Sequence, residues 1–93
     1  MKNLDYKEIG MRIRKARLMR GFTQESFAEL AGISTSFIGH IERAEKVPSI
    51  ETLASISQIL EVSIDYIVFG YLPSEESLYN DIQTILLKYR EQK

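Results

Sequence analysis

Hydrophobic residues along this chain recur at intervals of three and four positions, which is the spacing of one face of an α-helix. The first stripe, Ile9, Ile13 and Ala16, is followed by Gly21, a natural helix stop. Similar stripes predict helices at about residues 5–20, 24–31, 35–43, 50–60 and 64–69. No segment alternates between apolar and polar residues for long, so we expect an all-α fold.

Four of these helices are predicted to begin at a side chain that can cap a helix N-terminus. Thr23, Ser34 and Ser63 each follow one apolar residue and precede another by four positions, which is the hydrophobic-staple arrangement. Ser49 follows Pro48 and precedes the stripe of the fourth helix. The caps therefore indicate the helix starts independently of the stripes.

A separate amphipathic segment lies near the C-terminus. Gly70 ends the compact part of the chain, and a break around Pro73 follows. The sequence thus predicts a domain at residues 7–70 and a short helix at residues 74–91. This helix either docks on its own domain or forms a symmetric dimer contact, and another protein partner is a third alternative. The residues of the possible dimer contact are Tyr71, Leu78, Ile82, Ile85, Leu86 and Tyr89.

Composition excludes several classes of function. The chain has 93 residues, 44% hydrophobic and 27% charged, which fits one small domain. It has no cysteine, which excludes disulfides, thiolate metal sites and cysteine nucleophiles. With one histidine and no glycine-rich phosphate loop, it lacks the parts of the usual hydrolytic sites. We expect no enzyme activity, no metal and no cofactor.

The sequence also gives no sign of a membrane protein. No run of hydrophobic residues approaches the roughly 18 that a spanning helix needs. The first residues lack the apolar segment of a secretory signal. We therefore expect a cytoplasmic location and no membrane partner.

The net charge of −1 conceals a strong polarity along the chain. Residues 1–20 hold seven basic and two acidic side chains, a net charge of +5, whereas residues 49–93 carry −4. Such a basic end can face phosphates while the acidic remainder keeps the protein soluble. The alternative is that these cations form only the solvated face of a helix.

Residues 24–43 hold two predicted helices that are too short to be stable alone, so each must stabilise the other. Ala28 lets the second helix cross closely, and Gly32 allows a sharp left-handed turn. Ile33, Ile38 and Ile41 supply the apolar contacts between the pair. This combination meets the steric demands of a DNA-binding helix-turn-helix.

At this level of detail the sequence resembles the Cro and repressor family of helix-turn-helix regulators, the XRE family. The resemblance covers about residues 7–70, and its motifs are Gly21-Phe22-Thr23-Gln24-Glu25-Ser26-Phe27-Ala28, Gly32-Ile33-Ser34, Ile41-Glu42, Pro48-Ser49, Val62-Ser63, Asp65-Tyr66 and Phe69-Gly70.

The resemblance implies a five-helix, lambda-repressor-like DNA-binding domain, followed here by a short additional C-terminal helix. Its third helix would enter the major groove of double-stranded DNA. The implied function is that of a sequence-specific transcriptional regulator, a repressor that binds a near-palindromic operator as a homodimer. The alternative is an antitoxin-like or other protein-interaction module on the same fold.

The third helix is expected to carry the residues that read bases. Thr35, Ser36 and His40 match the reading positions of the family, and Phe37 is split between core and groove. Gly39 faces the same way; either it permits close approach to the duplex, or glycine is simply tolerated there. The first turn has no Arg, Asn or Gln for a bidentate base contact, so we expect specificity to depend largely on DNA shape and phosphate register.

The contacts to phosphate are expected to surround this helix. Gln24, at the start of the second helix, matches the family glutamine that bonds the DNA backbone, aided by free N–H groups there. The full set of phosphate candidates is Arg14, Thr23, Gln24, Ser34, Arg43 and Lys46.

Two further expectations concern the C-terminal end of the third helix. The resemblance implies that Arg17 pairs with Glu42 and so fixes the angle of the helix; the alternative is two unrelated surface charges. Ala44 stands where many relatives have glycine, and alanine is disfavoured in the left-handed region. We therefore expect an exit of different shape, which affects the placement of Glu45 and Lys46.

Overall fold

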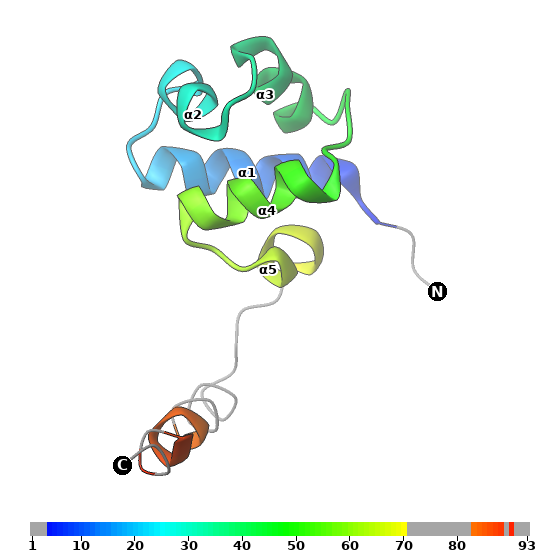
Figure 1. Cartoon of the computed structure of the whole chain (residues 1–93). Helices are drawn as coiled ribbons and strands as arrows, with labels where there is room; N and C mark the ends of the chain where they lie inside the picture. The colour runs from blue at the N-terminus through cyan, green and yellow to red at the C-terminus, as the bar shows by residue number, and fades with distance from the viewer. Residues whose placement is uncertain (1–3, 71–82, 89, 91–93) are drawn as a thin grey trace.

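The computed structural model describes residues 4–70, 83–88 and 90, and within these ranges the chain is helical without any strand. The helices of the domain lie within one residue of the predicted bounds, and residues 83–88 are helical as well. The predicted all-α fold is therefore confirmed. The helices are α1 (Tyr6–Met19), α2 (Gln24–Ala31), α3 (Thr35–Glu42), α4 (Ile50–Leu60) and α5 (Ile64–Phe69) (Figure 1).

Each of the five helices begins at a side chain that accepts hydrogen bonds from its first turn. At α1 this is Asp5, which the sequence pattern had not indicated. At the other four helices the hydroxyl accepts from the amide three residues later, at 2.9–3.1 Å. Each such cap contributes about 1 kcal/mol. These four caps are the predicted Thr23, Ser34, Ser49 and Ser63.

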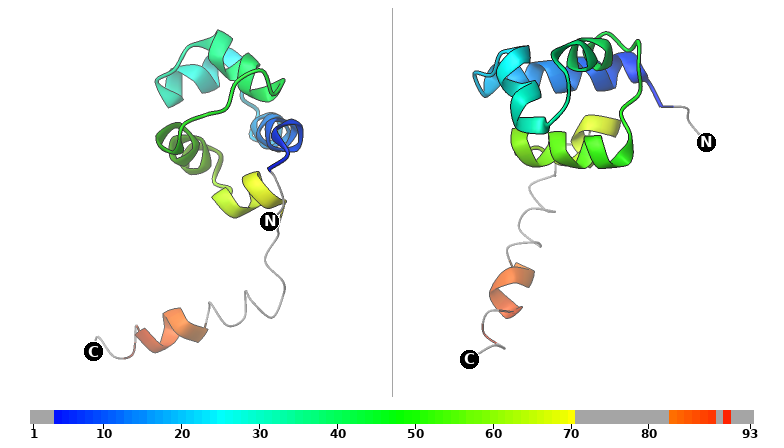
Figure 2. Two further views of the ribbon diagram at one scale, coloured as in Figure 1. Left: turned by 90° about the vertical axis from the view of Figure 1, so that its right-hand side faces the viewer. Right: turned by 45° about the horizontal axis from the view of Figure 1, so that its top comes forward.

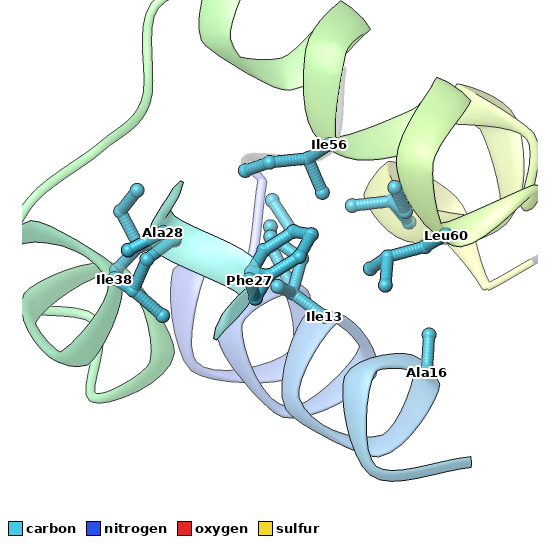
Figure 3. Packing of buried hydrophobic residues seen from close by; sticks show 10 residues of the cluster. Ile13, Ala16, Phe27, Ala28, Ile38, Ile56 and Leu60 are labelled. Atoms are coloured by element: carbon cyan, nitrogen blue, oxygen red, sulfur yellow. The ribbon is translucent and has the colours of Figure 1, made fainter. Parts of the chain in front are cut away.

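The α2–α3 pair lies on one side of α1 and α4, and α5 lies on the other (Figures 1 and 2). Phe27 of α2, fully buried, lies among Ile13 of α1 and Ile56 and Leu60 of α4 (Figure 3). Because one aromatic ring joins three helices, α2 and α3 are anchored to the domain through the core. The remaining buried hydrophobic residues are Ile9, Ala16, Ala28, Ile38, Ile41 and Ile67.

Gly10 brings α1 into direct contact with the backbone at the end of α3. A Cβ atom on Gly10 would lie 2.6 Å from the carbonyl oxygens of both Ile41 and Glu42, closer than real Cβ atoms come. Only glycine permits this approach. The crossing sets the position of the C-terminal end of α3.

The C-terminal segment is described only at residues 83–88 and 90. Ile85 and Leu86, two members of the predicted hydrophobic stripe, are 65% and 49% exposed. The other proposed contact residues lie outside the described part of the chain; they are Tyr71, Leu78, Ile82 and Tyr89. None of the described helices is both long enough and apolar enough to cross a membrane.

Candidate nucleic-acid interface

A tight turn joins α2 to α3. Gly32 adopts the left-handed conformation with φ 70°, and the amide of Ile33 donates to the carbonyl of Ala28 at 3.1 Å. Ala28 and Ile38 are buried to within 2% of complete, so the two helices pack directly through them. The predicted helix-turn-helix is therefore present as a packed unit, with α3 held across the domain.

The predicted reading residues lie along one stretch of α3 with different exposure. Thr35 and Ser36, in the first turn, are exposed. Phe37 is half-buried and packs against the core, as the sequence had indicated. The side chain of His40 is 36% exposed. The first turn thus presents two hydroxyl groups, and one imidazole follows a turn later.

Gly39 differs from the expectation of an open surface. It is buried, and a Cβ atom at this position would lie 2.9 Å from Nη1 of Arg43. The guanidinium of Arg43 therefore covers the backbone of Gly39. A duplex can approach Gly39 closely only if Arg43 moves, which the helical pattern alone could not indicate.

Arg17 and Glu42 form a bidentate ion pair beneath α3. Nε of Arg17 donates to Oε2 of Glu42 at 2.7 Å, and Nη2 donates to Oε1 at 3.0 Å. Nη1 donates to the carbonyl of Phe22 at 2.8 Å. The two side chains are only 6% and 3% exposed. The two residues are therefore not unrelated surface charges. Arg17 ties α1 to the end of α3 and to Phe22, the residue before the N-cap of α2.

Gln24 belongs to the same network. Its amide nitrogen donates to Oε1 of Glu42 at 3.2 Å. One N–H of the residue predicted to bind phosphate is therefore used inside the protein, where it holds the N-terminus of α2 against the base of α3. This bond does not use the second N–H or the carbonyl oxygen of the Gln24 amide.

A hollow of about 510 Å³ lies where α2 and α3 begin. It is lined from three helices and the segment that connects α1 to α2, and it brings two predicted phosphate residues beside a predicted base-reading residue. The hydroxyl of Thr23 caps α2 by accepting from the amide of Ser26 at 2.9 Å, and Ser34 caps α3 in the same way. The lining residues are Arg17, Leu18, Phe22, Thr23, Gln24, Glu25 and Thr35.

The exit of α3 corrects the expectation about Ala44. Ala44 has φ 62°, so it adopts the left-handed conformation that a glycine would have. The amide of Glu45 donates to the carbonyl of His40 at 2.8 Å, and the amide of Ala44 donates to that of Ile41 at 3.1 Å. These two bonds are those of a Schellman motif. The exit therefore has the shape that glycine gives, and alanine is strained to make it.

This turn gathers three charged or titratable side chains at the end of α3. Nε of Arg43 donates to Oε1 of Glu45, and Nδ1 of His40 lies 3.6 Å from Oε2 of the same carboxylate. The hydrogen bond from Arg43 lowers the pKa of Glu45 below its ordinary value, and the charge of Arg43 acts in the same direction. Glu45 therefore bonds Arg43 and lies close to His40, two residues that the sequence assigned to DNA.

Several cations of the basic N-terminal region have structural partners instead of facing solvent alone. Nη1 of Arg12 donates to the carbonyls of Ile67 and Val68, which ties α5 to α1. Nε of Arg20 donates to the carbonyl of Leu60 at 3.1 Å. With Arg17 also paired, three of the seven basic side chains in residues 1–20 hold the fold together. The charge of this region thus overstates what is available to a polyanion.

The other predicted phosphate residues are exposed. Arg14 lies on the outer face of α1, where it lines a shallow hollow of about 410 Å³ with Met11, Lys15, Leu18 and Met19. Lys46 is exposed just beyond the α3 exit. The structure therefore places Arg14 at a different hollow from Thr23 and Gln24. Within the part of the chain that is described, no three His, Asp or Glu side chains gather as a metal site would require.

Known proteins similar to this chain contain a helix-turn-helix as well. A family of helix-turn-helix domains matches residues 13–67. The HTH-type transcriptional regulator YazB of Bacillus subtilis is 43% identical over 56 residues, which cover 60% of this chain and 81% of that protein. The HTH-type transcriptional regulator SinR of Bacillus subtilis is 35% identical over 86 residues, which cover 82% of this chain and 78% of SinR.

A solved structure is similar as well. The P22 c2 repressor protein, crystallised with a synthetic operator, has a TM-score of 0.66 and 33% identity, and the match covers 68% of this chain and 96% of the repressor. The chain therefore belongs to the helix-turn-helix family of the XRE type. It is a DNA-binding transcriptional regulator and not an enzyme, as the sequence had predicted.

Proposed function

We propose that this helix-turn-helix protein is a repressor that binds a near-palindromic operator as a homodimer, with α3 in the major groove. The observation that carries the proposal is that α3 is held by the domain at its C-terminal end while its first turn is exposed. The buried Arg17–Glu42 pair and the Gly10 crossing fix its C-terminal end, while its first turn presents Thr35 and Ser36 to solvent. A reading helix needs such support, because contacts to bases require a fixed angle and depth.

Base reading falls to Thr35, Ser36 and His40. A hydroxyl can both donate and accept, so it discriminates only modestly between bases. Phe37 and Gly39 contribute at the edges, Phe37 through its exposed part and Gly39 once the Arg43 side chain has moved. With no bidentate reader in the first turn, the shape and deformability of the duplex supply much of the specificity.

Phosphate binding falls to the surroundings of the hollow at the start of α2. Thr23 caps α2, a helix of eight residues, and Gln24 is its first residue. At a helix N-terminus, unpaired N–H groups and the helix dipole favour an anion. Ser34 caps α3 next to it. Cations outside this hollow complete the contact: Arg14 on the outer face of α1, and Arg43 and Lys46 at and beyond the end of α3.

A homodimer follows from the size of the reading surface. One helix reads only a few base pairs, whereas two copies related by a two-fold axis read half-sites about 34 Å apart. The dimer contact is the stripe of residues 74–91 together with Tyr71, separate from the DNA-binding domain at residues 7–70. Ile85 and Leu86 are exposed, as are all of residues 83–88, so both side chains are accessible to a second copy. The protein acts in the cytoplasm, where the DNA is.

Selection of bound fragments from a random duplex pool tests the proposal. We expect enrichment of a near-palindrome with half-sites about 10 base pairs apart. The logarithm of the binding constant should fall linearly with the logarithm of the salt concentration, with a slope of about −0.9 for each phosphate neutralised. Sedimentation of the full chain should give a dimer, and deletion of residues 74–93 should give a monomer. Failure to enrich any sequence at low salt would contradict the proposal and favour the protein-interaction alternative.

A further inference from the structure

The end of α3 holds a carboxylate in a place where a DNA-binding surface is expected to be basic. Glu45 follows α3 by three residues and is 48% exposed, so its charge is not required by the core. It accepts a hydrogen bond from Nε of Arg43, and His40 lies 3.6 Å from its other oxygen. Arg43 and His40 are the two residues that the proposed function assigns to phosphate and base.

The backbone fixes this arrangement. The left-handed Ala44 turns the chain back, and the amides of Glu45 and Lys46 both donate to the carbonyl of His40, at 2.8 and 3.2 Å. The Glu45 side chain is thereby returned over the last turn of α3. The Arg43 guanidinium in turn lies on Gly39. In the unbound protein, one carboxylate therefore keeps Arg43 over the surface of the helix.

A carboxylate and a phosphate offer a guanidinium the same kind of acceptor. For Arg43 to bind a phosphate it must leave Glu45, and the carboxylate then stands unpaired near a polyanion. A duplex that offers only phosphates regains little from this exchange. On a duplex that also offers a matching base edge, the freed carboxylate can accept from Nδ1 of His40, 3.6 Å away, and orient the imidazole toward the base. This new pairing offsets the loss of Arg43 on the cognate duplex alone.

We propose that Glu45 is a specificity-determining residue that competes with DNA for Arg43 and so weakens binding to non-cognate duplexes more than to the cognate one. This inference rests on the proposed function, since it assumes that α3 enters the groove. It assigns Glu45 a role opposite to that of a binding residue: its removal improves non-specific affinity.

The Arg20–Glu61 pair provides a matched control. It is also an exposed ion pair between an arginine and a glutamate, with side chains 42% and 66% exposed. It joins the end of α1 to the α4–α5 connection and involves no residue of α2 or α3. Glu61→Gln therefore makes the same change of net charge as Glu45→Gln at a site away from α3.

The experiment measures the affinity of the full chain for two duplexes, the one enriched from the random pool and a scrambled duplex of the same length and composition. For Glu45→Gln we expect affinity for the scrambled duplex to rise about three- to tenfold, and affinity for the enriched duplex to change by less than about twofold. The salt slope on the scrambled duplex should steepen by about 0.9, which corresponds to one further phosphate. Glu61→Gln should leave both affinities within about twofold.

A second pair of variants shows whether the effect passes through Arg43. In an Arg43→Ala background, Glu45→Gln should change the scrambled-duplex affinity by less than about twofold. Without DNA, nuclear magnetic resonance should show faster solvent exchange of the Arg43 Nε proton in Glu45→Gln than in the parent chain.

Three outcomes would overturn the inference while leaving the proposed function in place. The first is an equal gain on both duplexes, which indicates general repulsion. The second is a loss confined to the enriched duplex, which makes Glu45 a base contact. The third is a gain that persists in the Arg43→Ala background. Failure of the parent chain to bind either duplex would instead overturn the proposed function and the inference with it.

Discussion

Two glutamates three positions apart, Glu42 and Glu45, each pair with an arginine, and the two pairs differ in almost every other respect. The Glu42 side chain is 3% exposed and bonds two nitrogens of Arg17, which lies 25 positions away in the sequence. The Glu45 side chain is 48% exposed and bonds Arg43, two positions away. Burial, and not the type of residue, decides that the first pair fixes the helix and the second can exchange partners.

The largest expected effect comes from breaking the buried pair. Arg17→Ala leaves Glu42 buried without its cation, which should lower the free energy of unfolding by about 3–5 kcal/mol. Urea denaturation followed by circular dichroism measures this change. DNA affinity should fall with it, because α3 loses its fixed angle.

Glu61→Gln is the control, since it removes the charge of an exposed pair and leaves the bond from Arg20 to the carbonyl of Leu60 in place; its effect should be about 1 kcal/mol or less. Glu42→Gln, which keeps the shape and one acceptor oxygen but leaves the Arg17 cation without a counter-charge, should also destabilise and provides a second variant. Loss of DNA binding by Arg17→Ala with an unchanged unfolding midpoint would place Arg17 on phosphate and contradict the structural role.

The next effect concerns the backbone contact behind the buried pair. Gly10→Ala would place a methyl group 2.6 Å from two carbonyl oxygens, so the end of α3 would have to move. We expect destabilisation of about 1–3 kcal/mol, typical of overpacking, although alanine has the higher helix propensity. Thermal unfolding measures it. An unchanged or raised melting temperature would show that α1 and α3 do not cross so closely.

A smaller effect of opposite sign is expected at the turn between the two glutamates. Ala44→Gly should stabilise the protein by about 0.5–1 kcal/mol, because glycine adopts the left-handed conformation without strain. The melting temperature should rise by a few degrees. Gly32→Ala, where glycine already occupies the left-handed position, should lower it. A fall for Ala44→Gly would indicate that the exit of α3 is not left-handed.

The smallest effect is the pH dependence of the exposed pair. Because Arg43 lowers the pKa of Glu45 in the folded protein, this pair contributes stability above the ordinary carboxyl pKa of about 4.5. That contribution is lost as the pH falls through the lowered folded-state value. The difference in melting temperature between the parent chain and Glu45→Gln should therefore shrink from pH 7 toward pH 3. A difference that grows on acidification would contradict the direction of the shift.

The helices and their starts could be predicted because their signals are local. A cap such as Ser34 bonds an amide three residues away, and a stripe such as Ile9 and Ile13 repeats within one turn. The reading residues of α3 follow from the same periodicity combined with the family resemblance. That resemblance also supplied the pairing of Arg17 with Glu42, which periodicity alone does not give.

The features that the sequence did not indicate depend on partners far along the chain. Nothing near Gly10 shows that the carbonyls at the end of α3 will lie against it. Arg12 and Arg20 bond carbonyls 55 and 40 positions away, so the sequence shows their positive charge but not these structural bonds. At Ala44 a local preference gave the wrong shape, because the two hydrogen bonds of the Schellman motif outweigh the strain in alanine.

The central claim is that DNA binds across the start of α2 and the surface of α3. Nuclear magnetic resonance of the ¹⁵N-labelled full chain, titrated with the enriched duplex, tests it most directly. We predict that the largest amide shifts fall at Thr23, Gln24, Thr35, Ser36 and His40. Shifts concentrated on α4, α5 or residues 83–88, with those five amides unchanged, would contradict the account.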